Sequence, residues 1–195
     1  MLSDAVKGGS SLLGQHAASV EDLQWSPRGD TCFASASADG SIALWDSRQP
    51  GACTGRLERA HLSDVNVISW NALSEHLLAS GGDDGVINVW DLRQVSNSNA
   101  PAISHKWHRD AITSIEWSPH DAACLVASGA DHQVTLWDFT AEPLDNTPNN
   151  DVPAHLLFIH QGQRDIKEVH WHSQMPGTVI STAADGFNIF RTISI

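Results

Sequence analysis

The spacing of the tryptophans constrains the fold of this chain more than any other feature. Seven of the eight tryptophans fall into four segments that have nearly the same internal spacing. The paired positions are Trp25 with Trp45, Trp70 with Trp90, Trp117 with Trp137, and Trp171 with Phe190. The first three pairs are 20 residues apart and the fourth is 19 apart, and the second members recur at steps of 45, 47 and 53 residues. Self-similarity at such a period indicates a repeat architecture, so we interpret the chain as four copies of one structural unit.

Each unit carries the pattern of short β-strands joined by tight turns. Apolar, β-branched runs such as Val65–Ile68 and Val86–Val89 favour strands over helices. Asp-Gly pairs at 39–40, 84–85 and 185–186 are typical of β-hairpin turns. Four strands, a period near 45 residues and a closing Trp-Asp together resemble the blade of the WD-repeat family.

That resemblance implies an all-β fold, a WD-repeat β-propeller of which about four blades are present. We expect the blades within residues 11–195, with repeats at about 16–46, 61–93, 108–138 and 160–191. Residues 1–10 are expected to form a flexible N-terminus, and the polar, proline-rich stretch 140–153 a flexible acidic loop. A seven-bladed ring needs roughly 300 residues, so we predict a partial propeller, a fragment of such a ring that forms an open arc.

The resemblance also implies a buried hydrogen-bond network of histidine, aspartate, serine and tryptophan in each blade. The sets of the first and second repeats are complete in the sequence. The third repeat has Ala127 in place of the serine, and the fourth ends in Phe190, which has no indole N–H, so we expect weaker blades there. The expected network residues are His16, Ser35, Asp39, Trp45, His61, Ser80, Asp84, Trp90, His108, Asp131, Trp137, His160 and Asp185.

The composition narrows the classes of function. Lysine plus arginine number 11 and aspartate plus glutamate number 23, which gives a net charge of −12. This charge argues against direct nucleic-acid binding, which needs a basic patch, and favours basic protein partners. Three widely separated cysteines predict neither a disulfide framework nor a paired-cysteine zinc site. No stretch approaches 18 apolar residues, which argues against a membrane-spanning helix.

Motifs of catalysis are missing from the sequence. It contains no glycine-rich phosphate loop, no nucleophile elbow and no HExxH segment. His170 and His172 lie on one face of an expected strand, where they could hold a metal ion, but no third ligand is indicated. We therefore predict that the protein is not an enzyme and has no catalytic residues, cofactor or metal site.

Two arginines are candidates for contact with a partner. Arg48 and Arg93 each complete a Trp-Asp-x-Arg sequence, on consecutive repeats. The motif resembles that of WD-repeat proteins serving cullin-type ubiquitin ligases, in which this arginine contacts the ligase adaptor. An exposed arginine can anchor such an interface by bidentate pairing. The alternative is that each arginine only pairs with a local aspartate.

Five longer stretches are more specific than the general repeat. They are Ser19–Pro27, Asp64–Trp70, Ala127–Val134, Leu157–Gly162 and Gly186–Ile195. Together they resemble the C-terminal half of the glutamate-rich WD-repeat-containing proteins, which are related to the retinoblastoma-binding histone chaperones. The resemblance implies a nuclear and nucleolar binding scaffold of ribosome biogenesis, which escorts a basic large-subunit ribosomal protein, with histone binding as a further property. A substrate receptor of a cullin-type ubiquitin ligase is the alternative function.

Overall fold

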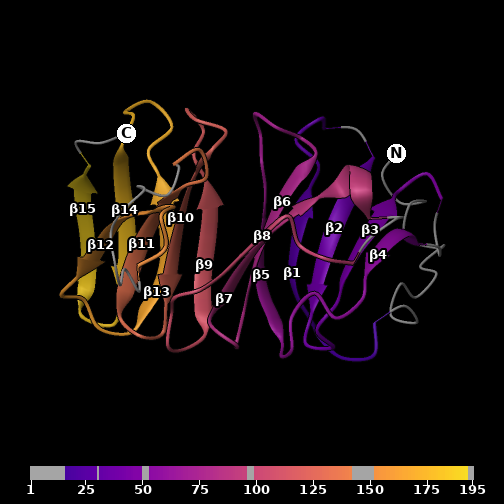
Figure 1. Ribbon diagram of the computed structural model, residues 1–195, viewed down its shortest axis with the longest axis horizontal. Helices are drawn as coiled ribbons and strands as arrows, with labels where there is room; N and C mark the ends of the chain where they lie inside the picture. The colour runs from indigo at the N-terminus through magenta and orange to yellow at the C-terminus, as the bar shows by residue number, and fades with distance from the viewer. Residues whose placement is uncertain (1–15, 30, 50–52, 96–98, 142–151, 193–195) are drawn as a thin grey trace, which may run out of the picture.

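Four antiparallel sheets stand side by side in the computed structural model (Figure 1). The structure describes residues 16–29, 31–49, 53–95, 99–141 and 152–192. The expected flexible N-terminus and most of the expected acidic loop, at residues 142–151, lie outside these ranges. The regular structure of the described residues is all strand apart from one 3-10 turn, η2 (Leu92–Gln94), which confirms the all-β class.

The strands follow the sequence repeats. The first sheet contains β1 (Val20–Trp25), β2 (Cys32–Ser37), β3 (Ile42–Asp46) and β4 (Cys53–Leu57). The second contains β5 (Val65–Trp70), β6 (Leu77–Gly82), β7 (Val86–Asp91) and β8 (Ile103–Lys106). The third contains β9 (Ile112–Trp117), β10 (Cys124–Gly129), β11 (Gln133–Asp138) and β12 (Leu156–Gln161). The fourth contains β13 (Ile166–Trp171), β14 (Thr178–Ala183) and β15 (Gly186–Arg191).

Each sheet is a meander, because strands consecutive in the sequence are hydrogen-bonded neighbours. The expected Asp-Gly hairpins connect the second and third strands of the first, second and fourth sheets. Gly85 has a φ of 70°, and a Cβ atom there would lie 2.4 Å from the carbonyl oxygen of His108, so only glycine fits this turn. The third sheet has His132 at the corresponding place, with a φ of 67°.

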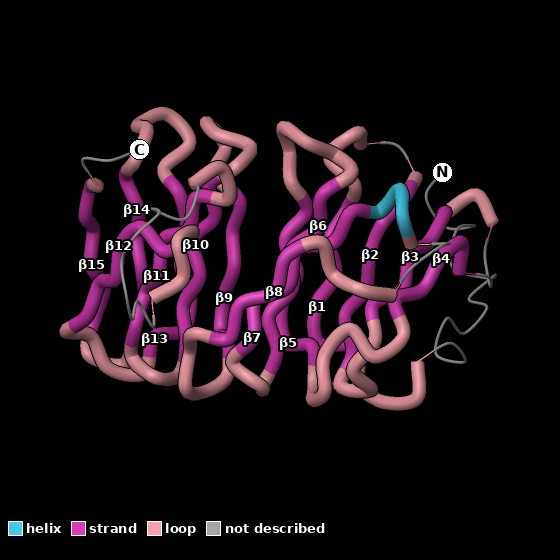
Figure 2. Tube along the Cα trace, viewed as in Figure 1, coloured by secondary structure: helices cyan, strands magenta, loops and turns pink. Residues whose placement is uncertain are grey.

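The sheets are arranged as an arc. Their first strands, β1, β5, β9 and β13, contact one another in succession and form its inner line. Figure 2 shows the strands running between two rims of loops. One rim carries the turns between second and third strands, and the opposite rim carries the turns between first and second strands.

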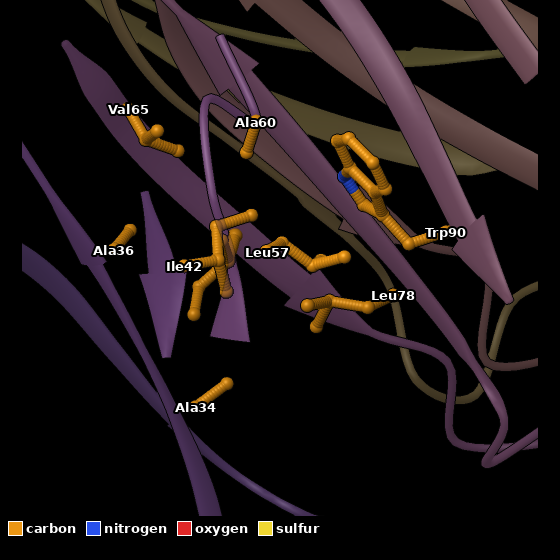
Figure 3. Packing of buried hydrophobic residues seen from close by; sticks show 9 residues of the cluster. Ala34, Ala36, Ile42, Leu57, Ala60, Val65, Leu78 and Trp90 are labelled. Carbon is orange, nitrogen blue, oxygen red and sulfur yellow. The ribbon is translucent and has the colours of Figure 1, made fainter. Parts of the chain in front are cut away.

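The hydrophobic core lies between the sheets. In the first of three clusters, Ala34 and Ile42 of the first sheet pack against Leu78 and Trp90 of the second, and all four are at most 2% exposed (Figure 3). Equivalent clusters join the second sheet to the third and the third to the fourth. At each of these three interfaces, the preceding sheet contributes a face of small and aliphatic side chains and the following sheet contributes the face with its repeat tryptophans.

The arc is open at both ends. Among the described strands, extensive packing is found only between consecutive sheets and not between the first and the fourth. The outer face of the first sheet leaves Leu23 and Trp25 62% and 61% exposed, and that of the fourth leaves Phe187 and Ile189 67% and 62% exposed. The chain thus forms a partial propeller of four blades. No helix within the described residues is long and apolar enough to cross a membrane.

Candidate protein-interaction surfaces

The second blade contains the full expected network. His61 Nδ1 lies 3.0 Å from Asp84 Oδ1, and His61 Nε2 lies 2.8 Å from Ser80 Oγ. The indole N–H of Trp90 donates to the same Ser80 oxygen over 2.9 Å. The histidine side chain is fully buried. These hydrogen bonds join four segments of the second blade. Each polar group is buried away from water and finds its hydrogen-bond partner in another member of the set.

The first blade repeats this geometry. His16 bridges Asp39 at 3.1 Å and Ser35 at 2.7 Å, and Trp45 donates to Ser35 over 2.8 Å. Burial acts to raise the pKa of Asp39, but hydrogen bonds from Ser41, the Ala17 N–H and the histidine outweigh it and hold that pKa well below its ordinary value. The carboxylate is therefore ionised and fixes the loop that leads into β1.

The third blade corrects the expectation of an incomplete set. Its hydroxyl comes from Thr135 on β11, which is the cross-strand partner of Ala127 on β10. His108 Nε2 lies 2.9 Å from Thr135 Oγ1, and the Trp137 indole donates to that oxygen over 2.8 Å. His108 Nδ1 lies 2.9 Å from Asp131 Oδ1, so the network is complete with its hydroxyl moved across one strand pair.

The fourth blade corrects the assignment of His160. This residue lies in β12, the last strand of the third blade, where its ring stacks on Phe190 with centroids 4.2 Å apart and its Nε2 lies 3.2 Å from Asn188 Nδ2. The network position is occupied instead by Gln163, which is buried and accepts a hydrogen bond from the Ser181 hydroxyl. Asp185 accepts the backbone N–H of Arg164 over 3.3 Å. The network position lies three residues later in the chain than expected, because β12 extends past His160.

The two Trp-Asp-x-Arg arginines adopt one geometry. Arg48 Nη2 lies 2.7 Å from Asp46 Oδ2, and Arg93 Nη2 lies 2.6 Å from Asp91 Oδ2. The hydrogen bonds from these arginines lower the pKa of both aspartates to about 2. The arginine side chains are nevertheless 70% and 67% exposed. Both sit on the same rim of the arc, directly after the third strand of their blade, and present a similar charged surface to solvent.

An acidic groove runs along the inner strands. Its volume is about 360 Å³, and no lysine or arginine of the described chain lines it. Its ionisable lining residues are Glu21, Asp22, Glu116, Glu168 and His170. Burial raises the pKa of Asp22 and of Glu116, although backbone N–H groups donate to both and His170 Nδ1 lies 3.3 Å from Glu116 Oε2. Cations close to these carboxylates would relieve the cost of their burial.

Sequence reasoning missed this groove, although a signal is present. Six of its polar residues occupy the positions one and three before the repeat tryptophans: Asp22 and Gln24, Ser114 and Glu116, Glu168 and His170. Alternate residues of a strand share one face, so these side chains point in the same direction from each first strand. Only the alignment of the four inner strands side by side brings them into one surface.

His170 and His172 are the two histidines that could share a metal ion according to the sequence. Within the described ranges, no group of three or more histidine, cysteine, aspartate or glutamate side chains could hold a metal ion. His170 pairs with Glu116, whereas the Nδ1 atom of His172 accepts the backbone N–H groups of Gln174 and Met175. The two histidines thus have separate local partners.

Four meander sheets around a line of inner strands, with buried histidine–aspartate–hydroxyl–tryptophan sets, define a WD-repeat scaffold. The chain belongs to the WD domain, G-beta repeat family, which matches residues 10–46, 51–91 and 100–138. The fourth sheet, in which glutamine and phenylalanine replace two network residues, lies outside the matched ranges.

Three curated relatives are similar over nearly the whole chain. Protein HEAT STRESS TOLERANT DWD 1 of Arabidopsis thaliana is 53% identical over 92% of this chain and 41% of its own length. Ribosome assembly protein rrb1 of Schizosaccharomyces pombe is 50% identical over 95% of this chain and 41% of its own length. Glutamate-rich WD repeat-containing protein 1 of Dictyostelium discoideum is 48% identical over 91% of this chain and 38% of its own length, which confirms the resemblance noted in the sequence. The chain thus spans about two fifths of these relatives.

Proposed function

We propose that this chain is a non-enzymatic binding scaffold of ribosome assembly, which holds a basic protein client in the acidic groove of its inner strands. The observation that carries the proposal is the groove itself. Carboxylates line it, and none of the described residues that line it is a lysine or an arginine. The similarity to a ribosome assembly protein supports the process, and the net charge of −12 supports a basic client. We propose a large-subunit ribosomal protein as that client, and the nucleus and nucleolus as the location.

Electrostatics favours such a client in two ways. A surface of one sign attracts the opposite charge over several ångströms and accelerates encounter. Partly buried carboxylates such as Asp22 and Glu116, whose pKa is raised by burial, then gain a cation that replaces lost hydration. Lysine- and arginine-rich segments supply these cations with long, flexible side chains that reach into a groove.

The test compares two variants of equal charge change. Glu21→Gln with Glu168→Gln removes two groove carboxylates, whereas Glu58→Gln with Glu75→Gln removes two carboxylates outside it. We expect a lysine- and arginine-rich large-subunit ribosomal protein to bind the groove variant about tenfold more weakly, measured by calorimetry at several salt concentrations. The control variant should bind nearly as well as the unmodified chain. Equal weakening by both variants, or by neither, would show that the groove is not the client site.

Histones are a second class of basic client. The two client classes are distinguished by comparing their affinities for the unmodified chain and for the same two variants. If core histones bind more tightly than the ribosomal protein at equal salt, and only the groove variant weakens them, the groove serves histone binding instead. A ribosomal protein that binds more tightly favours the assembly role. Both outcomes leave the groove as the site and differ only in the client.

The exposed arginine pair favours one alternative, a substrate receptor of a cullin-type ubiquitin ligase. We propose Arg48 and Arg93 as its adaptor-binding residues, since both keep most of their side chain exposed in matching geometry. Arg48→Ala combined with Arg93→Ala should abolish capture of the ligase adaptor. Arg28→Ala is the matched control, because Arg28 is also exposed and also paired with a carboxylate, that of Glu75. Adaptor capture that survives the double change would remove this alternative.

A further inference from the structure

The free face of the first sheet is one half of a sheet–sheet interface. Its side chains Val20, Leu23, Trp25, Phe33 and Trp45 line an apolar hollow of about 400 Å³. The corresponding side chains of the second sheet, one repeat later, are Val65, Ile68, Trp70, Leu78 and Trp90. Ile68 is only 4% exposed because the first sheet covers it, whereas its counterpart Leu23 is 62% exposed.

The free face of the fourth sheet is the other half of the same kind of interface. In the third sheet, Val134 and Leu136 are fully buried against the fourth. One repeat later the same positions are Phe187 and Ile189, which are 67% and 62% exposed. The two ends of the arc therefore expose complementary faces, one that a preceding sheet would cover and one that a following sheet would cover.

The hydrogen bonds that the repeat tryptophans donate between neighbouring sheets follow the same direction. The Trp117 N–H donates to Ser69 Oγ over 3.1 Å, and the Trp171 N–H donates to Glu116 Oε2 over 2.7 Å. The indole N–H groups of these two tryptophans donate to the carbonyl oxygens of the same two residues, each over 3.0 Å. For the repeat tryptophans, the acceptors therefore lie on the preceding sheet and the donors on the following one.

The corresponding donor and acceptor positions at the two ends of the arc face no neighbouring sheet of the described chain. On the first sheet, Trp25 occupies the donor position and is 61% exposed. On the fourth sheet, His170 occupies the acceptor position, directly before the repeat tryptophan, and is exposed. The apolar side chains and the donor and acceptor positions are thus both complementary between the two ends.

We propose that a second copy of this chain covers both free faces, with the fourth sheet of each copy packed on the first sheet of the other. Two such contacts related by a twofold axis close a ring of eight blades, within the range of four to eight that propellers use. Closure leaves neither apolar face exposed, whereas the described part of a single chain leaves both exposed. Additional blades in a longer chain would compete for the same faces, so the proposal concerns the 195-residue chain by itself.

The experiment is a mass measurement by light scattering on the purified 195-residue chain. We expect a discrete species of twice 21.1 kDa from low to high micromolar concentration. Leu23→Glu and Ile189→Glu place a charge on the first and the fourth free face, at side chains that are already exposed in a single copy. Each change should convert the pair to single copies. Leu73→Glu is the control, since Leu73 is 54% exposed in the turn between β5 and β6, on neither face, and it should leave the pair intact.

Mixing the two variants tests the head-to-tail direction. A mixed pair of the Leu23→Glu and Ile189→Glu chains contains one contact with no introduced charge, so association should partly return on mixing. A symmetric contact between like faces predicts instead that one of the two variants still pairs alone. Single copies of the unmodified chain at high micromolar concentration would overturn the proposal. Open-ended polymers, or a pair that resists either glutamate, would overturn it as well.

Discussion

The second and fourth blades come from the same repeat but differ in how they are held. In the second, His61 and Trp90 are buried and joined through Ser80, and sheets cover both faces. In the fourth, Gln163 and Ser181 form the only buried polar pair of the network among the described residues, Phe190 offers no donor, and one face is open. The comparison teaches that a repeat sets the path of the chain, whereas buried polar sets and neighbouring sheets set its stability.

The largest expected difference between these blades concerns their closing aromatic residues. Trp90 is 2% exposed and donates to Ser80, so Trp90→Ala removes core packing and leaves a buried hydroxyl short of a partner. We expect it to lower the free energy of unfolding by about 3–5 kcal/mol. Phe190→Ala should cost less, because Phe190 is only partly buried and carries no network hydrogen bond. Urea denaturation of both variants checks this; equal shifts in midpoint would refute the contrast.

A moderate effect is expected at the relocated hydroxyl of the third blade. Thr135→Val keeps the shape of the side chain but leaves the His108 ring nitrogen and the Trp137 indole without their shared oxygen. We expect a loss of about 1–3 kcal/mol in the free energy of unfolding.

The rescue variant makes this prediction specific. Ala127→Ser added to Thr135→Val places a hydroxyl on β10, at the position that Ser35 and Ser80 occupy in the first two blades. Denaturation midpoints should return most of the way to the unmodified value. A double variant no more stable than Thr135→Val alone would show that the hydroxyl does not act through the network.

The blades and part of their hydrogen-bond networks could be predicted from the sequence, whereas Thr135, Gln163 and the acidic groove could not. The tryptophan spacing and the β-branched runs predicted four β-blades, and the resemblance to the WD-repeat family implied the network of the first two. Both rest on the rule that position along a strand determines which face a side chain occupies. Sequence reasoning missed Thr135, since a hydroxyl can cross to the paired strand without changing the spacing. It missed Gln163, since β12 runs through His160 and moves the loop by three residues. The acidic groove escaped because it joins residues that only the packing of separate repeats brings together.

A smaller effect should appear as a pH dependence in the contact between the second and third blades. His105 of β8 and His155 share a hydrogen bond of 2.8 Å, and His105 stacks on Trp137. Burial, and then the nearby His155, lower the pKa of His105. Below the ordinary histidine pKa of about 6.5 the unfolded chain therefore takes up a proton that the folded chain resists, so stability is full above that pH and falls below it.

The measurement compares the midpoints of urea denaturation between pH 7.5 and pH 5. His105→Phe keeps a ring over Trp137 without a titrating group, so it should flatten part of this fall. His120→Phe is the control, because His120 is exposed and lies on neither β8 nor the His155 segment. An unchanged slope in His105→Phe would show that this pair does not couple to folding.

The smallest effects should come from surface ion pairs, and they should be alike in the two blades compared above. Arg93 pairs with Asp91 in the second blade, and Lys167 pairs with Asp165 over 2.6 Å in the fourth. Both cations are largely exposed, so water and salt screen each attraction and the ordering of a long side chain offsets it. Arg93→Ala and Lys167→Ala should each leave the denaturation midpoint within experimental error of the unmodified chain. A clear loss in only one blade would mean that surface charge, and not the buried network, distinguishes the second blade from the fourth.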